Sequence, residues 1–166
     1  MSLDKTKYPK GSEWRKWDLQ VQTILDDNYE SLHSYYTTLK SKDPDKWDNF
    51  VEKVGGEAQA LKYDSEAYFN GSDTKRDRCY NYVRTFFSFL NIYNPSLGCI
   101  GITDHNYYDE MLLDIFIEYS EDQECQVIPG VEINVGGIHV LVYFKEIPYE
   151  QLTFSEGIKK FLSKID

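Results

Sequence analysis

The chain has 166 residues, of which 41% are hydrophobic and 16% aromatic, so it is long enough for one domain with a buried core and is not a disordered tail. With 18 basic and 28 acidic residues, its formal net charge of -10 disfavours unspecific binding to nucleic-acid backbones or anionic membranes. A cation is the more natural partner. Nucleic acid stays open as a substrate, because carboxylates that hold metal ions often face phosphates through those ions.

The cysteines and the apolar runs bear on the cellular compartment. Cys79, Cys99 and Cys125 are odd in number, far apart and without CxxC spacing, which argues against a disulfide framework or a zinc finger. No apolar run approaches the ~20 residues that a membrane span needs, and the first residues lack the apolar stretch of a signal peptide. We therefore expect a cytoplasmic protein that does not enter a membrane.

The first half of the chain is predicted to contain one strand and then helices. Alternating apolar and polar residues at 17–23 predict a strand that carries Gln20 and Gln22 on one face. Apolar residues at helical spacing then predict three helices, at 26–42, 44–54 and 74–90. The stretch between the second and third of these helices is expected to be irregular.

The second half is predicted to alternate strands and helices, which indicates an α/β architecture with one hairpin. The expected elements are a strand at 97–103 covered on both faces, a helix at 107–120, two strands in QVIPGVEINV and GIHVLVYF, and a last helix at 155–165.

The hairpin gives the sharpest local geometry. A two-residue turn at Gly136 and Gly137 places Asn134 opposite His139, and Glu132 points the same way as Asn134. Glu132 and His139 are then diagonal neighbours with backbones roughly 7 to 8 Å apart, close enough for both tips to reach one ion. A carboxylate and an imidazole suit Zn, Mn or Fe. The alternative is a solvated strand glutamate beside a hydrogen-bonded histidine.

Asp104 and His105 follow the predicted buried strand at its carboxyl end. Polar residues at that edge of an α/β sheet lie where substrates normally bind, which makes both of them candidate site residues. The alternative is ordinary turn chemistry, with Asp104 capping the next helix and His105 exposed in a loop.

Four runs together, DLQVQT, ITDHN, PGVEIN and GGIHVLVYF, resemble the polymerase and histidinol phosphatase (PHP) family. Its corresponding runs are DLHxHT, TDH, GxE and a histidine that starts a strand. The opening KGSEWRKWDLQVQT resembles the subgroup in which such a domain precedes a P-loop ATPase module, although the chain has no GxxxxGK[ST] run. The resemblance implies one PHP-like domain over 1–166, an incomplete (β/α)7 barrel with an α-helical insertion at about 26–92.

The resemblance also implies a two- or three-metal cluster that hydrolyses phosphomonoesters or phosphodiesters, with nucleic acids and nucleotides among the candidate substrates. Glu132 would bridge two ions, His139 would bind one of them, and His105 would bind a further ion with Asp104 beside it as orienting residue or ligand. Asp104, His105 and Glu132 would thus be the catalytic residues, and the cofactors would be Zn, Mn or Fe.

Gln20 and Gln22 depart from this pattern, because they occupy the positions of two histidines that hold the first metal in the family. An amide offers a weak neutral oxygen where imidazole is a strong donor, so fewer ions than the family's two or three are expected. Two hypotheses follow. One is a weakened metal-dependent phosphoesterase, and the other is a degenerate PHP-like scaffold that binds a protein partner such as an ATPase module.

Overall fold

The computed structural model describes residues 16–26, 32–63, 73–144, 160 and 163–164. Its strands and helices, in chain order, are β1 (Lys16–Val21), α1 (His33–Lys42), α2 (Pro44–Val54), α3 (Glu57–Lys62), α5 (Lys75–Tyr93), β2 (Leu97–Ile102), α6 (Glu110–Ser120), β3 (Gln126–Val135) and β4 (Ile138–Tyr143). Among the described residues, none of these helices is both long and apolar enough to cross a membrane.

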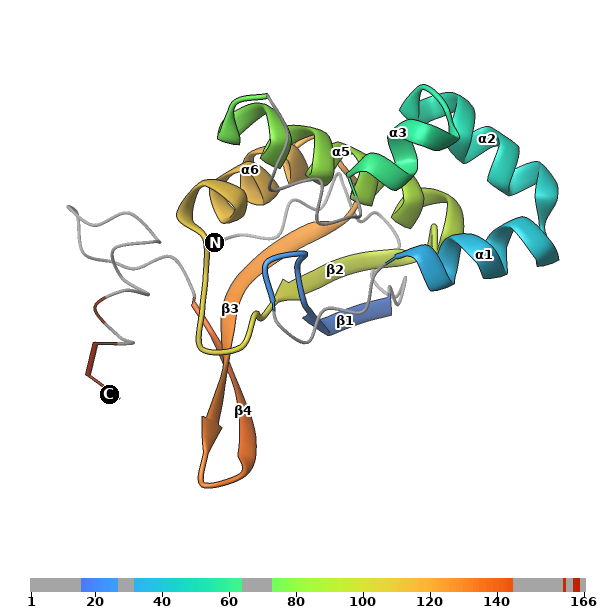
Figure 1. The fold of residues 1–166 in the computed structure, drawn as a ribbon. Helices are drawn as coiled ribbons and strands as arrows, with labels where there is room; N and C mark the ends of the chain where they lie inside the picture. Colours follow the sequence, from blue (N-terminus) through green and yellow to red (C-terminus); the bar gives the residue numbers. More distant parts are fainter. Residues whose placement is uncertain (1–15, 27–31, 64–72, 145–159, 161–162, 165–166) are drawn as a thin grey trace, which may run out of the picture.

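The strands form one mixed sheet in the order β1-β2-β3-β4. The first three strands run parallel, and β4 returns antiparallel to β3 through the turn at Gly136 and Gly137. In Figure 1 this hairpin projects beyond the other two strands. The protein is thus α/β, but the expected incomplete (β/α)7 PHP-type barrel is wrong for the part of the chain that the structure describes, which has four strands. Helices between β1 and β2 were expected, but a tight turn replaces the crossover helix after β3, so β4 pairs antiparallel and the alternation of strand and helix stops there.

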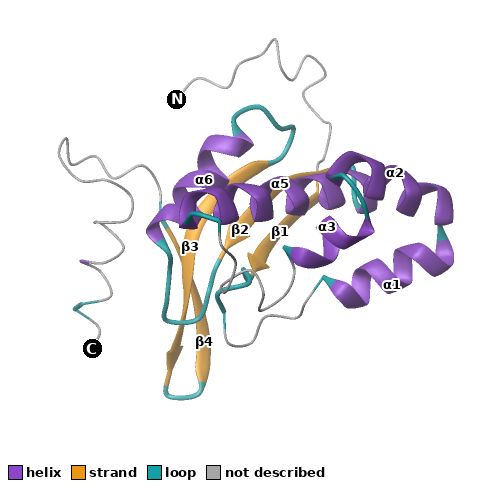
Figure 2. Ribbon diagram, turned by 45° about the horizontal axis from the view of Figure 1, so that its top comes forward, coloured by secondary structure: helices purple, strands orange, loops and turns teal. Residues whose placement is uncertain are grey.

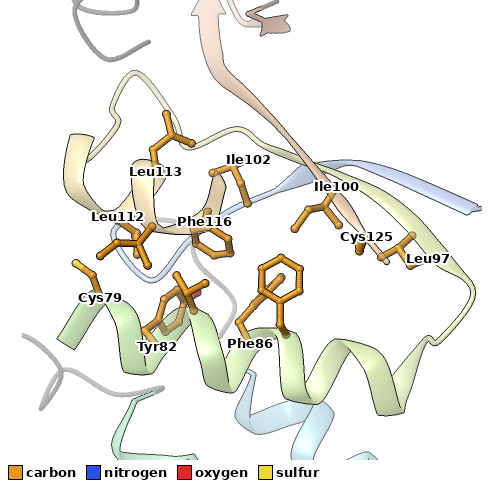
Figure 3. Close-up of a cluster of buried hydrophobic side chains, with 13 residues drawn as sticks. Cys79, Tyr82, Phe86, Leu97, Ile100, Ile102, Leu112, Leu113, Phe116 and Cys125 are labelled. Carbon is orange, nitrogen blue, oxygen red and sulfur yellow. The ribbon is translucent and has the colours of Figure 1, made fainter. Parts of the chain in front are cut away.

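The long helices α5 and α6 cover one face of the sheet, as Figures 1 and 2 show. Residues of α5, α6 and β2 make up the main core, in which Phe116, Val83 and Ile100 are each 0% exposed. In Figure 3, Tyr82 and Phe86 from α5 lie between that helix and the side chains of Ile100 and Phe116. Burial of this apolar surface is the main contribution to the stability of the fold. It also holds in place the carboxyl end of β2, after which Asp104 and His105 follow.

A second cluster joins α1 and α2 to the outer side of α5. Tyr36, Trp47, Phe50 and Phe89 pack there with ring centroids between 5.1 and 5.8 Å apart, in tilted or edge-to-face pairs. Such pairs add to the stabilisation from area burial alone. The helices after β1 are therefore a packed extension of the core and not a loose excursion.

The helix boundaries test the expectations from the sequence. The prediction for α2 is confirmed, because the Asp43 side chain accepts a hydrogen bond from the Lys46 N–H and Gly55 ends the helix with φ of 91°. The structure adds α3, where an irregular stretch was expected, and α1 begins at His33 instead of residue 26. The predicted last helix at 155–165 falls on residues of which the structure describes only 160, 163 and 164.

The sheet face opposite α5 and α6 is closed across its strands by Tyr143. Its hydroxyl donates a hydrogen bond to the Leu19 carbonyl, so a residue of β4 reaches β1, the opposite edge strand. The ring lies over Gly101 and Gly130, where an added Cβ would come within 2.7 and 3.0 Å of ring carbons. Glu132 shares a face with Gly130 because side chains alternate along a strand. The curved sheet therefore directs Glu132 to this inner face, away from the helices.

Candidate metal centre

Backbone hydrogen bonds hold the loop after β2 against β3. The Glu132 N–H donates to the Asp104 carbonyl at 3.0 Å, and the Asn106 N–H donates to the Glu132 carbonyl at 2.8 Å. His105 and Glu132 consequently pair as an isolated parallel bridge. Asn106 then turns the chain with φ of 49°, a left-handed conformation that asparagine tolerates better than most residues. This pairing places the His105 imidazole beside the Glu132 carboxylate.

Two imidazoles converge on this carboxylate. Glu132 is 1% exposed, and its Oε1 lies 3.1 Å from His105 Nε2 and within hydrogen-bond distance of His139 Nδ1. One ligand atom from each of the three residues lies within 4.8 Å of the others. The β3–β4 register pairs Asn134 with His139, as the turn predicted, so Glu132 and His139 are diagonal neighbours. His105, Glu132 and His139 are called the ligand triad below.

Asp26, in the loop after β1, orients His105. Its Oδ2 accepts the His105 backbone N–H at 2.6 Å and lies 3.0 Å from Nδ1 of the same residue. The buried carboxylate thus binds Nδ1–H and leaves Nε2 directed at Glu132. A histidine held this way by a carboxylate is the usual support of a metal-binding imidazole. This role of Asp26 was not predicted from the sequence, in which the residue stands at the start of a predicted helix, because only the folded loop brings it to His105.

The charges of the triad follow from these contacts. Burial by itself lowers the pKa of His105, but the hydrogen bond and the charge of Asp26, together with Glu132, outweigh it and raise that pKa above its ordinary value. Burial likewise opposes ionisation of Glu132, but hydrogen bonds from His139 and Gln20 outweigh it and lower the pKa of Glu132. The triad therefore places an ionised carboxylate between two imidazoles, and that negative charge is what would attract a cation.

The two glutamines lie beside the triad. Gln20 Nε2 donates to Glu132 Oε2 at 3.0 Å, and Gln22 Nε2 lies 3.1 Å from His105 Nδ1. Their amides thus contact Glu132 and His105, the two less exposed members of the triad, from the β1 side. Gln20 binds the Glu132 oxygen that the histidines do not use.

Asp104, which was predicted as a ligand and catalytic residue, points elsewhere. Its Oδ1 accepts the Thr23 backbone N–H at 2.6 Å and its Oδ2 accepts the Thr23 hydroxyl at 2.7 Å. Burial raises the pKa of Asp104 to about 6, against these two hydrogen bonds. Asp104 thereby joins the end of β1 to the end of β2, and it is not one of the three residues whose ligand atoms converge.

The donor set of the triad fits a divalent cation. Imidazole nitrogen and carboxylate oxygen are the donors that Zn, Mn and Fe accept. The triad supplies both, and Asp26 already selects the tautomer that leaves His105 Nε2 available. His105, Glu132 and His139 are thus the residues that would hold an ion.

The comparisons with known proteins add no further information on this site. No protein-family model, no curated protein and no solved structure matches the chain.

Asp26→Asn is expected to weaken metal binding by about 10- to 100-fold, the usual effect of changing a residue that supports a ligand. The amide keeps the size of the carboxylate, but it loses the charge that favours Nδ1–H of His105. Titration of the purified protein with Mn²⁺ or Zn²⁺ measures the change. Asp48→Asn, on an exposed part of α2, is the matched control. Equal affinities for the two variants would contradict the role of Asp26.

Proposed function

We propose that this chain is a metal-dependent phosphoesterase of low activity that uses His105, Glu132 and His139 as metal ligands. The observation that carries the proposal is the convergence of these three ligand atoms within 4.8 Å, with a buried carboxylate between two imidazoles. Three protein ligands of the type His₂Glu, with a further position for water or substrate, are typical of catalytic zinc sites, whereas structural sites close with four.

The chemistry divides between the ion and the protein residues around it. When bound, a divalent ion supplies Lewis acidity toward a phosphoryl oxygen and toward water. Glu132 supplies the negative charge that holds a cation at this position, and Asp26 keeps His105 in the binding tautomer. The Gln20 amide donates one N–H to Glu132 and has a second N–H to offer to an anionic substrate.

Phosphate esters are proposed as substrates on two grounds. The runs DLQVQT, ITDHN, PGVEIN and GGIHVLVYF resemble those of the PHP family, and the residues that carry the resemblance include all three members of the triad. In addition, a chain of net charge -10 needs a bound cation to attract an anionic substrate. Low activity is proposed because Gln20 and Gln22 offer weak neutral oxygens where a second ion would need imidazoles.

Two measurements test the proposal. The first is the metal content, by elemental analysis, of protein purified without chelator. The second is the rate of Mn²⁺-dependent hydrolysis of p-nitrophenyl phosphate and bis(p-nitrophenyl) phosphate. We expect about one ion per chain, as a single three-ligand site implies, and slow hydrolysis of at least one ester. His139→Ala should lose both the ion and the hydrolysis, because Glu132 and His105 alone leave two ligands.

His33→Ala is the matched control, since His33 lies on α1 and is not a member of the triad. It should retain the metal content and the rate of the parent chain. A chain that binds the ion but hydrolyses neither ester would instead favour the degenerate scaffold, and a chain that binds no ion would contradict the proposal.

A further inference from the structure

The far end of the β3–β4 hairpin carries an uncovered apolar face. Val135 is 59% exposed, Ile138 is 68% exposed and Val140 is 41% exposed. Val135 and Ile138 pair across the two strands, and Ile133 and Val140 pair next to them on the same face. Glu132 points to the other face. Figure 2 shows the hairpin extending away from α5 and α6, so among the described residues no helix covers this face near the turn.

The outer edge of β4 is open as well. Because a two-residue turn closes the hairpin, Ile138, Val140 and Val142 exchange backbone hydrogen bonds with β3. The backbone N–H and C=O groups of His139 and Leu141 consequently point away from β3. In the sheet of the described residues β4 has no second neighbouring strand. A row of such backbone groups is a template for pairing with another strand.

The two edges of the sheet differ in how they are protected. Open edges are usually blunted by charges, prolines or bulges. The β1 edge follows this rule, because its register is irregular between Asp18 and Val21, and the Asp18 side chain accepts the Gln20 backbone N–H at 3.2 Å. The register of β4 with β3 is regular, and residues 133–144 contain no Asp, Glu, Lys, Arg or Pro. The β4 edge therefore lacks these protective features.

The composition of the hairpin fits a second copy of the chain. Two copies that each carry a net charge of -10 repel one another, so a contact between them needs an uncharged surface, and the hairpin is one. It is also self-complementary. In an antiparallel arrangement about Val140, Ile138 of each copy faces Val142 of the other, and Val140 faces its own equivalent. These β-branched residues favour strand pairing.

We propose that β4 pairs antiparallel with β4 of a second copy, so that the protein is a symmetric dimer with one continuous sheet. Each copy uses this edge once, and assembly through it therefore stops at two. On the other face, the pairing places Leu141 of the second copy opposite His139. The His139 side chain is 53% exposed, more than the other two members of the ligand triad. The dimer thereby shields the outer side of the candidate metal centre, and it forms whether or not an ion is bound.

Sedimentation equilibrium over chain concentrations of about 5 to 500 µM tests the proposal. This range brackets a dissociation constant of about 10–100 µM, which suits a contact smaller than the 1,200–2,000 Å² of stable interfaces. The fraction of dimer should rise across the range. Val140→Lys places two like charges directly opposite each other and should leave a monomer at every concentration. Tyr80→Lys, at a 48% exposed residue of α5, is the matched control and should dimerise as the parent chain does. Far-ultraviolet circular dichroism establishes that both variants fold.

A cysteine cross-link tests the register independently of Val140→Lys. Directly opposite residues of a non-hydrogen-bonded pair have Cα atoms about 4.5 Å apart, which a disulfide can span. Val140→Cys should therefore form a cross-linked dimer with oxidised glutathione. The parent chain should not, because its three cysteines are buried. Tyr80→Cys controls for random collisions and should stay uncross-linked.

Three results would each overturn the dimer. They are a parent chain that is monomeric at the highest concentration, a dimer that survives Val140→Lys, and equal cross-linking of the Val140→Cys and Tyr80→Cys variants. The first would leave the hairpin free for a different protein, and the second would place the contact between copies on another surface. None of them bears on the proposed metal binding, which is measured separately by metal content.

Discussion

Glu132→Gln is expected to abolish stable metal binding, lowering affinity by more than about 100-fold. Glu132 is the sole carboxylate of the ligand triad, and its Oε1 faces both His105 Nε2 and His139 Nδ1. An amide has almost the same shape but no negative charge, so the cation would meet two imidazoles and a weak neutral oxygen. Since changes outside the first coordination shell already weaken binding by 10- to 100-fold, losing this ligand should exceed that range.

Metal content after dialysis, with Mn²⁺ and Zn²⁺ titrations, measures the effect of Glu132→Gln. The Glu52→Gln variant removes an exposed carboxylate on α2 and is the matched control. Far-ultraviolet circular dichroism and the melting temperature establish that both variants fold. A folded Glu132→Gln chain that retains the metal content of its parent would show that the ion, if any, lies elsewhere.

The hairpin shows how much of the site could be predicted from the sequence. A turn of two glycines, with φ of 60° and 85° at Gly136 and Gly137, fixes the register of β3 and β4 without help from distant residues. The position of Glu132 as a diagonal neighbour of His139 follows directly from that register. The buried strand β2 was equally predictable, because six consecutive residues covered on both faces leave a continuous apolar run.

Asp26 and Asp104 show what the sequence could not provide. Asp26 begins the predicted helix at 26–42 and Asp104 follows the predicted strand at 97–103, and both positions suit an ordinary helix start or cap. Their partners, His105 and Thr23, are 79 and 81 residues away along the chain. Only tertiary packing decides which of the two supports a ligand and which joins two strand ends.

The error in the barrel prediction has a related cause. Short motifs specify the ends of strands, where polar residues gather, but they do not specify how many strands pair. The actual sheet of the described residues ends in an antiparallel β4, and Tyr143 of that strand bonds to Leu19 of β1 across Gly101. The four sequence runs could therefore predict the local geometry of the site, but they could not predict the number of strands in the sheet.

Replacing both Gln20 and Gln22 with histidine is expected to add a second ion per chain and to raise phosphoester hydrolysis by at least about 100-fold. The amide of Gln20 lies 3.0 Å from Glu132 Oε2, the carboxylate oxygen that His105 and His139 leave unused. Imidazoles on this side would let the Glu132 carboxylate serve one ion through each oxygen. A second Lewis acid contributes several kcal/mol of transition-state stabilisation, and each 1.4 kcal/mol is tenfold in rate.

The metal readout of this double variant is independent of its activity. The metal content measured by elemental analysis should rise from about one ion per chain to about two, as in two-metal sites. Adding Glu132→Gln to the double variant should remove both ions, since both depend on the one carboxylate. Gln123→His adds a histidine near the end of α6, where Gln123 contacts Asn91, and should change neither metal content nor rate. A double variant that folds, still binds one ion and gains no hydrolysis would show that imidazoles from β1 do not complete this centre. The low activity would then have to come from the surroundings of the triad and not from the two missing ligands.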